Sequence, residues 1–313
     1  NAAVQGPSGR ELDVEAIEQW LIAALREAPY KERIACIVPV AHGAAAVLVD
    51  RNHEIVAAPD YEDACFERVN DAYRVQRDAY ASSYSPDLPL GLNLGRQLFH
   101  LEQMQPQLFA RVAHVLLYPQ FWAWRLSGVM ASEVTSLGCH SDLWLPLQQS
   151  FSNLAVARGW NRLFPPLRSA CDRLGNISAE IAAATGLHPK CQVACGIHDS
   201  NASYLKFLIA RDRNEPFTVV SSGTWTVVMA NRADLTGLRE ERDMLANVDA
   251  FGSPVATARF MGGREYEAIS GQDARPNLPA LLNVIERRAM ALPSFASGGP
   301  FAGRPGSLLN AES

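Results

Sequence analysis

The stretch CQVACGIHDSNA (residues 191–202) joins an apolar run to a polar turn that contains an aspartate. Residues 191–197 have the composition of a buried strand, and a helix is expected to follow at residues 202–210. In an open α/β sheet, ligands bind at the carboxyl ends of the strands, which is where this turn would lie. The stretch therefore predicts an α/β fold with Asp199 at the ligand-binding edge.

Asp199 stands between His198 and Ser200, directly after the predicted strand. A carboxylate in this place can accept a hydroxyl proton during phosphoryl transfer, or it can help to hold a divalent ion. Aspartate, serine and asparagine are also good N-cap residues, and the local sequence taken by itself favours a plain helix cap. These residues alone leave both roles open.

Further helices and strands are expected on the amino-terminal side of this stretch. The capping-box pattern from Ser8 to Glu11 and the apolar repeat after it predict an opening helix that ends at Pro29. Ile34–Val38 has the composition of a buried strand, and Ala45–Asp50 predicts a second strand. More helices are expected at residues 67–80, 96–105, 107–116, 120–127 and 176–185.

A second α/β unit is expected to start near residue 212. Residues 217–221 and 225–230 have the composition of two strands, and Ser222-Gly223-Thr224 joins them as a tight turn would. The backbone N–H groups near Gly223 are unshielded, so the turn could face phosphate oxygens. An ordinary hairpin turn explains the same residues, and the chain has no Walker-type loop.

Two further pairs of residues follow predicted strands at the same edge as Asp199. His42 and Gly43 come after the first buried strand, and Asp60 and Tyr61 come after the third extended run. Carboxylate and imidazole groups can bind sugar hydroxyls, while an aromatic ring can cover the apolar face of a sugar. A histidine after a strand is more often a structural residue, so this alternative stays open.

Composition narrows the class of protein and its partners. The chain has 313 residues, 48% hydrophobic and 19% charged, which is typical of a folded globular protein of two domains. With a net charge of -5 and no basic, aromatic-rich stretch, we expect no nucleic-acid partner. The apolar runs are shorter than the roughly 20 residues of a membrane helix, so we expect no membrane partner and a cytoplasmic location. Six scattered cysteines lack zinc spacing, and we expect reduced thiols.

Three motifs in this order resemble a known family. GIHDSNA (residues 196–202) and SSGTW (residues 221–225) look like the two central motifs of FGGY carbohydrate kinases. EVTSLGCHSDLW (residues 133–144) is similar to a segment of the branch that includes rhamnulose and fuculose kinases. The resemblance extends over most of residues 10–270.

This resemblance implies an α/β fold of two actin-like, ribonuclease-H-like domains with a central cleft. Residues 1–211 would form the sugar-binding domain without its first strands, and residues 212–313 would form part of the nucleotide-binding domain. The beginning of the chain departs from the family pattern, because it lacks the acidic, glycine-rich strand-turn motif that helps to hold phosphate and magnesium. The end departs as well, since the family continues beyond residue 313.

The resemblance also assigns roles to individual residues. Asp199 matches the catalytic base and would help to hold Mg²⁺. The residues implied to contact the sugar are His42, Gly43, Asp60, Tyr61, Asn93, His198 and Asn201. The residues implied to meet ATP are Gly223, Thr224, Gly262 and Gly263.

The leading hypothesis is transfer of the ATP γ-phosphoryl group to a primary hydroxyl of a ketose. The branch resemblance favours a 6-deoxyketohexose such as L-fuculose or L-rhamnulose over a pentulose. The expected partners are a sugar and ATP, and the sequence does not decide whether the protein forms a homodimer. The alternatives are a sugar-binding protein of the same fold without kinase activity and, with less support, a metal-dependent phosphohydrolase built on His198 and Asp199.

Overall fold

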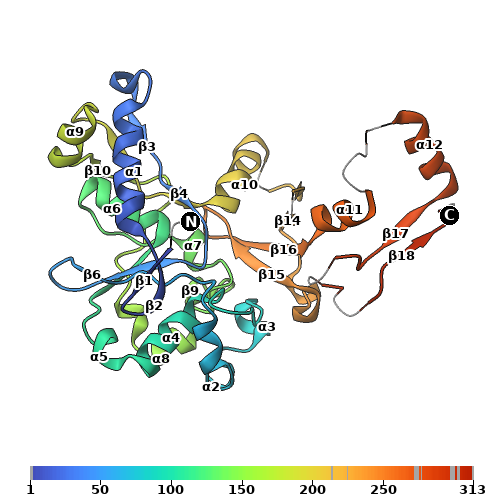
Figure 1. Ribbon diagram of the computed structural model, residues 1–313, viewed down its shortest axis with the longest axis horizontal. Coiled ribbons are helices and arrows are strands. Elements are labelled where there is room, and N and C mark those ends of the chain that lie inside the picture. Colours follow the sequence, from blue (N-terminus) through green and yellow to red (C-terminus); the bar gives the residue numbers. More distant parts are fainter. Residues whose placement is uncertain are drawn as a thin grey trace. The chain divides into compact units, whose positions relative to one another are not determined.

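The computed structural model describes residues 3–212, 214–223, 225–270, 275, 277–296, 300–301 and 304–311 (Figure 1). Contacts between these residues define two compact units. The first unit contains the residues up to 214 together with residues 246–255, and the second contains residues 215–245 together with those from 256 onward.

The first unit opens with a hairpin and a helix. Strands β1 (Ala3–Gly6) and β2 (Gly9–Leu12) pair antiparallel, and α1 (Val14–Glu27) follows. The expected start of the helix at Ser8 is wrong, because the backbone N–H and the hydroxyl of Ser8 both donate to Glu11 Oε1 within the hairpin. Asp13 caps the helix instead, since its Oδ1 accepts the N–H of Ala16 at 2.9 Å.

Two small sheets carry the strand ends that matter for the site. The first has the order β10-β11-β3, and the second pairs β12 with β4. The pairings of β3 with β11 and of β4 with β12 are parallel, so these strands all end at the same edge. Their bounds are β3 (Cys36–Ile37), β4 (Val40–Ala41), β10 (Arg173–Asn176), β11 (Gln192–Ala194) and β12 (Ile197–His198).

An antiparallel sheet with the order β6-β5-β7 forms the buried centre of this unit. Its strands are β5 (Ala46–Val49), β6 (Ile55–Ala57) and β7 (His114–Leu117). The helix expected at residues 107–116 is wrong beyond its first turn, because Leu116 pairs with the fully buried Val47 as part of β7. Extended pairing in the core outweighs the helical tendency of this segment. The unit also holds the short hairpin β8 (Trp144–Leu145) and β9 (Ser150–Phe151).

Helices cover these sheets, and several end where the sequence predicts. The expected helix at 120–127 is confirmed as α6, which has Pro119 in its first turn and Gly128 after it at φ 78°. The helix expected at 176–185 ends as predicted, but it starts later, as α9 (Ala179–Thr185), because Asn176 belongs to β10 and Ser178 caps the helix. The helices of this unit after α1 are α2 (Asn70–Arg74), α3 (Tyr80–Ser83), α4 (Leu94–Met104), α5 (Pro106–Phe109), α6 (Tyr118–Ser127), α7 (Val134–Leu137), α8 (Asn153–Ala157), α9 (Ala179–Thr185) and α10 (Asp199–Ala210), with 3-10 turns at Lys31–Arg33, Ala64–Val69 and Trp160–Arg162.

Helices α1, α6 and α9 pack together on one side of the unit (Figure 1). Their shared cluster contains Leu21 and Leu25 of α1, Leu126 of α6 and Ile181 of α9. The opposite end of α6 joins a second cluster with β5, in which Phe121 is 1% exposed. This packing fixes α1 and α6 as the two helices beside strands β3 and β4.

The second unit contains β13, β14 and most of β16, which belong to a sheet with the order β13-β14-β16-β15, while residues 246–248 of β15 are counted with the first unit. The predicted hairpin is confirmed, because β13 and β14 pair antiparallel with Ser221 opposite Val227. The elements are β13 (Thr218–Ser221), β14 (Thr226–Asn231), β15 (Met244–Val248), β16 (Pro254–Phe260), α11 (Gly262–Ser270), α12 (Leu278–Arg287), β17 (Met290–Leu292) and β18 (Ser307–Leu309), with 3-10 turns at Leu235–Gly237 and Glu240–Arg242. None of the helices in the described residues is long and apolar enough to cross a membrane.

Candidate active site

Asp199 lies at the junction of β12 and α10, as the sequence predicts. Ile197 and His198 form β12, and Asp199 is the first residue of the helix. The parallel register sets His198 opposite Ala41 of β4. His42 and Asp199 therefore leave neighbouring strands at the same edge of the sheet.

The Asp199 carboxylate is only partly used by the protein. Its Oδ1 accepts the N–H of Ser200 at 2.5 Å and the Ser200 hydroxyl at 3.2 Å, and it lies 3.2 Å from His198 Nε2. The N-cap residue is His198, so Asp199 does not hold the plain capping position. About half of its side chain, 51%, remains exposed. The carboxylate can therefore meet a ligand while it stays anchored through one oxygen.

His198 is the buried residue that holds this junction through its side-chain contacts. Its side chain is buried, its Nδ1 lies 3.3 Å from Asn201 Nδ2, and its Nε2 lies 3.7 Å from Cys139 Sγ. Burial lowers the pKa of the imidazole; the Asp199 carboxylate opposes this shift and His42 adds to it. The ring is therefore neutral near pH 7, and it leaves Asp199 without a paired positive charge on this side.

Gly43 has a packing role in the structure. A Cβ at this position would lie 3.1 Å from His198 Nε2 and 3.2 Å from Cys139 Sγ. These distances are tighter than ordinary contacts, so glycine allows the loop after β4 to pass close to His198. Whether Gly43 also contacts a sugar stays a prediction.

Sequence reasoning missed the role of Glu133 in supporting the junction. Glu133 is fully buried, and its Oε2 accepts the N–H of Thr135 at 3.0 Å and the Thr135 hydroxyl at 2.5 Å. The Thr135 Oγ1 in turn accepts the backbone N–H of His198 at 3.1 Å. Burial raises the pKa of Glu133 to about 7. The Glu-x-Thr start of α7 is a capping pattern that could have pointed to this link.

His42 and Tyr61 come together near Asp199. The ring of His42 lies 5.7 Å from that of Tyr61, edge to face, and 5.0 Å from that of Tyr118. Burial raises the pKa of the Tyr61 hydroxyl, and nearby carboxylates, Asp199 among them, raise it further. The pairing of an imidazole with aromatic rings beside a carboxylate suits a polyhydroxylated ligand.

The Asp60 carboxylate is buried and already engaged. Its Oδ2 lies 2.9 Å from Arg10 Nε, and its Oδ1 accepts the N–H of Glu62 at 3.1 Å. This ion pair ties the Tyr61 loop to the β1–β2 hairpin. Asp60 therefore holds Tyr61 in place, and a direct contact of Asp60 with sugar stays a prediction.

The expectation that the Asn93 side chain contacts the sugar needs correction. Asn93 is fully buried, and its Nδ2 donates to the carbonyl oxygens of Pro86 at 3.0 Å and His140 at 2.8 Å. Its Oδ1 accepts the N–H of Leu88 at 2.9 Å. The protein uses the donor and acceptor groups of this amide, so Asn93 fastens the loop before α4.

A cavity of about 490 Å³ lies beside Asp199. At its polar end it is lined by His42, Tyr118 and Asp199. The rest of its wall is apolar and comes from α1, from the segment of β3 and β4, and from α6: Ile17, Trp20, Leu21, Ile37, Val38, Pro39, Val40, Ala41, Trp122 and Leu126. The wall of the cavity is therefore mostly apolar, with His42, Tyr118 and Asp199 as its polar part.

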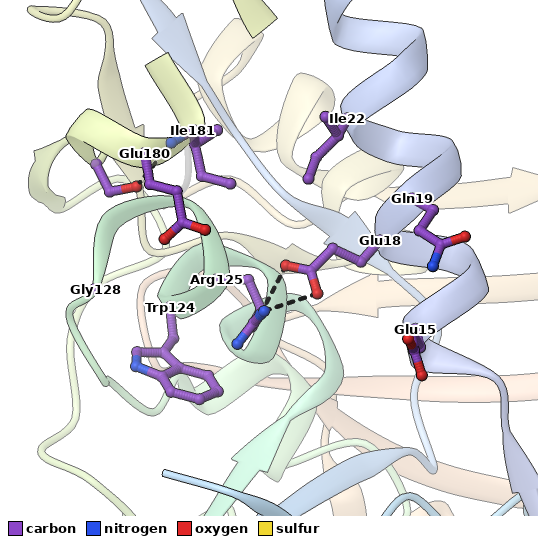
Figure 2. A pocket seen from close by; sticks show the side chains of 10 residues that line it. Glu15, Glu18, Gln19, Ile22, Trp124, Arg125, Gly128, Glu180 and Ile181 are labelled. Carbon is purple, nitrogen blue, oxygen red and sulfur yellow. Dashed lines mark hydrogen bonds and ion pairs between the residues drawn. The ribbon is translucent and has the colours of Figure 1, made fainter. Parts of the chain in front are cut away.

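A second cavity, of about 430 Å³, lies among α1, α6 and α9 and contains none of the predicted site residues (Figure 2). The carboxylate of Glu18 meets Arg125 there, with distances of 2.7 Å to Nε and 2.8 Å to Nη2. The Arg125 guanidinium also lies over the ring of Trp124 at 5.4 Å. These contacts pair the charge of Arg125 with that of Glu18 and connect α1 to α6.

Three of the predicted nucleotide residues, Gly223, Gly262 and Gly263, lie in the described part of the second unit. Gly262 and Gly263 open α11, and a Cβ on Gly262 would overlap Thr226 Oγ1 at the start of β14. The exposed Gly223 lies in the turn just before β14, while Thr224 lies outside the described residues. A helix start with two glycines is compatible with phosphate binding, and the role of these residues stays a prediction.

The described residues contain no cluster of three or more metal-ligating side chains. Magnesium in phosphoryl-transfer enzymes is held by one or two carboxylates together with the phosphates of the substrate. The half-exposed Asp199 carboxylate fits that manner of binding. Asp199 would be the one carboxylate from the protein that binds Mg²⁺, and the nucleotide phosphates would supply further oxygen ligands.

A carboxylate at a parallel strand-to-helix junction, together with a glycine-rich helix start in a second α/β unit, is the arrangement that the resemblance to carbohydrate kinases implies. The sequence model for "Carbohydrate kinase FGGY, C-terminal domain" matches residues 214–313. A crystal structure of a carbohydrate kinase from Novosphingobium aromaticivorans is 38% identical with a TM-score of 0.90, and the match covers 99% of this chain and 69% of that one. The chain belongs to the FGGY carbohydrate kinase family, and its fold is the actin-like fold of that family.

Other relatives agree with this family. L-fuculokinase from Escherichia coli strain K12 is 28% identical over 170 residues, which span 54% of this chain and 34% of the enzyme. Rhamnulokinase from Enterobacter sp. strain 638 is 27% identical over 193 residues, which span 58% of this chain and 36% of the enzyme. Xylulose kinase from Rhodospirillum rubrum, at 17% identity and a TM-score of 0.76, shares the fold. The matched stretch thus spans about a third of the curated relatives' length.

Proposed function

We propose that this protein transfers the γ-phosphoryl group of ATP to a primary hydroxyl of a ketose. The observation that carries the proposal is the Asp199 carboxylate, which is half exposed at the junction of β12 and α10 and lines the polar end of the 490 Å³ cavity with His42. Membership of the FGGY carbohydrate kinase family supports this reaction class.

In this reaction Asp199 acts as the general base. As the sugar oxygen bonds to the γ-phosphorus, the bond from that phosphorus to the β-phosphate oxygen breaks and ADP leaves. Asp199 takes the proton of the sugar hydroxyl, which makes that oxygen a better nucleophile. Mg²⁺, when bound with the nucleotide, neutralises phosphate charge. The neutral His198 ring and the Ser200 N–H keep the carboxylate in position.

The sugar would bind at the polar end of the cavity. His42 offers a ring nitrogen to a sugar hydroxyl, and the rings of Tyr61 and Tyr118 beside it suit the C–H face of the sugar. The names of the curated relatives, L-fuculokinase and rhamnulokinase, support a 6-deoxyketohexose as the substrate class. The second unit would bind ATP through Gly223, Thr224, Gly262 and Gly263.

The test is ADP release measured with a coupled assay over a panel of ketoses in the full-length protein. We expect the protein to form ADP with a higher kcat/KM when L-fuculose or L-rhamnulose is the substrate than when D-xylulose or L-ribulose is. Sugar binding by calorimetry without any ADP release would instead support a sugar-binding protein of the same fold. Release of phosphate from sugar phosphates without ATP would contradict the kinase assignment.

A further inference from the structure

A cavity of about 670 Å³ lies at the carboxyl end of β5, away from the loop that carries His42. Here Val49 pairs with His114 of β7, and the Val49 carbonyl oxygen accepts the N–H of Ala113 at 2.8 Å. A four-residue strand such as β5 is about 13 Å long. The cavity shares no lining residue with the one beside Asp199, so the two cavities are separate.

Two loops and the start of β7 surround this cavity. The turn after β5 supplies Arg51 and Asn52, and the loop after α5 supplies Arg111. His114 is the first residue of β7, and Leu163 adds an apolar wall. Small-molecule sites in proteins usually have volumes of about 300–1,000 Å³, so this cavity is large enough for a metabolite.

The carboxylate in the lining, that of Asp50, is already used by the turn. Its Oδ1 accepts the N–H of Asn52 at 2.8 Å and the N–H of Glu54 at 3.0 Å, and its side chain is 16% exposed. Its Oδ2 lies 3.9 Å from Arg111 Nη2, which is too long for a hydrogen bond. The Arg111 side chain is 55% exposed, and it keeps its N–H donors for a ligand.

Arg51 and His114 also keep donors that the protein does not use. The Arg51 side chain is exposed and forms no hydrogen bond or ion pair with the described residues. The His114 ring is half-buried and makes no hydrogen bond within the part of the chain that the structure describes. Burial lowers the pKa of this imidazole and His53 lowers it further, so the ring is neutral near pH 7 and carries one N–H. The lining therefore offers two guanidinium groups against one engaged carboxylate.

We propose that this cavity binds a small organic phosphate. Planar guanidinium groups donate pairs of N–H bonds that match phosphate oxygens, which suits Arg51 and Arg111. The His114 N–H and the Asn52 amide add neutral donors, and Leu163 offers an apolar surface to the carbon skeleton. An inorganic phosphate ion is much smaller than this cavity and would leave that surface uncovered. The site goes beyond the proposed kinase reaction and does not depend on it.

Calorimetry with the full-length protein tests this binding. The probes are D-ribose 5-phosphate, D-ribose and inorganic phosphate, added one at a time. We expect D-ribose 5-phosphate to bind more tightly than inorganic phosphate and D-ribose to give no binding. If D-ribose 5-phosphate does not bind, or binds no more tightly than inorganic phosphate, the proposal is overturned.

Variants show whether the phosphate binds in this cavity. Because a hydrogen bond to a charged group contributes about 1.5–3 kcal/mol, we expect Arg51→Gln and Arg111→Gln each to weaken the affinity for D-ribose 5-phosphate by about tenfold or more. Arg173→Gln is the matched control, since Arg173 is exposed on β10 and lies outside the cavity. Asp199→Asn should leave this affinity unchanged, which separates the cavity from the kinase site. Equal affinities of the Arg111→Gln and Arg173→Gln variants, or loss of binding in Asp199→Asn, would refute the assignment.

Histidine ring signals in NMR spectra locate the ligand independently of these variants. We expect D-ribose 5-phosphate to shift the ring signals of His114, assigned by their disappearance in His114→Gln. The ring of His188 lies outside the cavity, so its signals should stay in place. Binding by calorimetry without a shift of the His114 signals would place the phosphate elsewhere and overturn the proposal.

Discussion

Substitution of the buried Glu133 by glutamine probes the link that holds the junction of β12 and α10. Glu133 Oε2 accepts two hydrogen bonds from Thr135, and Glu133 Oε1 has no hydrogen-bond partner among the described residues. Glutamine keeps an oxygen for Thr135 and removes the ionisable group. Glu133→Gln therefore removes the charge of residue 133 while it keeps nearly the same side-chain size.

The size of the expected change in the free energy of unfolding follows from the raised pKa of Glu133. Burial raises the pKa of Glu133 from its ordinary 4.5 to about 7, and one pKa unit corresponds to about 1.4 kcal/mol, so ionisation in the folded state costs about 3 kcal/mol. The folded protein keeps this proton at a pH where the unfolded chain loses it. The stability that protonated Glu133 contributes is thus full below pH 4.5 and is lost as the pH rises through about 7.

We therefore expect the stability of Glu133→Gln, relative to the native protein, to increase between pH 4.5 and pH 8 by up to about 3 kcal/mol. Urea unfolding at several pH values, followed by tryptophan fluorescence of the first unit, measures the difference. Trp144 and Trp160 are buried reporters there. Glu27→Gln removes an exposed carboxylate from α1 and corrects for the general loss of charge. A difference between Glu133→Gln and the native protein that does not change with pH would refute the reasoning.

Two glycines give further predictions. Gly43→Ala places a methyl group against His198 and Cys139, so we expect a loss of about 1–3 kcal/mol in the free energy of unfolding, measured by urea denaturation, and Cys139→Ala in the same chain should recover part of it. Gly262→Ala overlaps the start of β14, so we expect weaker ATP binding by calorimetry with unchanged sugar binding; unchanged ATP affinity would remove Gly262 from the nucleotide site.

Local chemistry made parts of the fold predictable. Pro119 and Gly128 bracket α6, as expected, because proline suits the first turn and glycine adopts the positive φ after the last one. The β13–β14 hairpin and the position of Asp199 at a strand end follow from equally local patterns. Such signals depend on a few neighbouring residues, so they can be found in one sequence.

Other features depend on contacts between distant residues. The backbone N–H of Ser8 donates to the Glu11 carboxylate in this hairpin, as it would at a helix start, so the pattern alone could not distinguish the two. Residues 114–117 became a strand because β5 pairs with them. The support of His198 by Thr135 joins segments 63 residues apart, and no periodicity in the sequence could show it.

The role of Asp199 is tested most directly by Asp199→Asn in the full-length protein, with Asp71→Asn as a control for loss of an exposed carboxylate on α2. Asparagine keeps the size of the side chain but cannot accept the proton. We expect sugar binding by calorimetry to persist while kcat for ADP release falls about 10²–10⁴-fold, and we expect Asp71→Asn to keep normal turnover. Turnover of Asp199→Asn close to that of the control would contradict the assignment of Asp199 as the base.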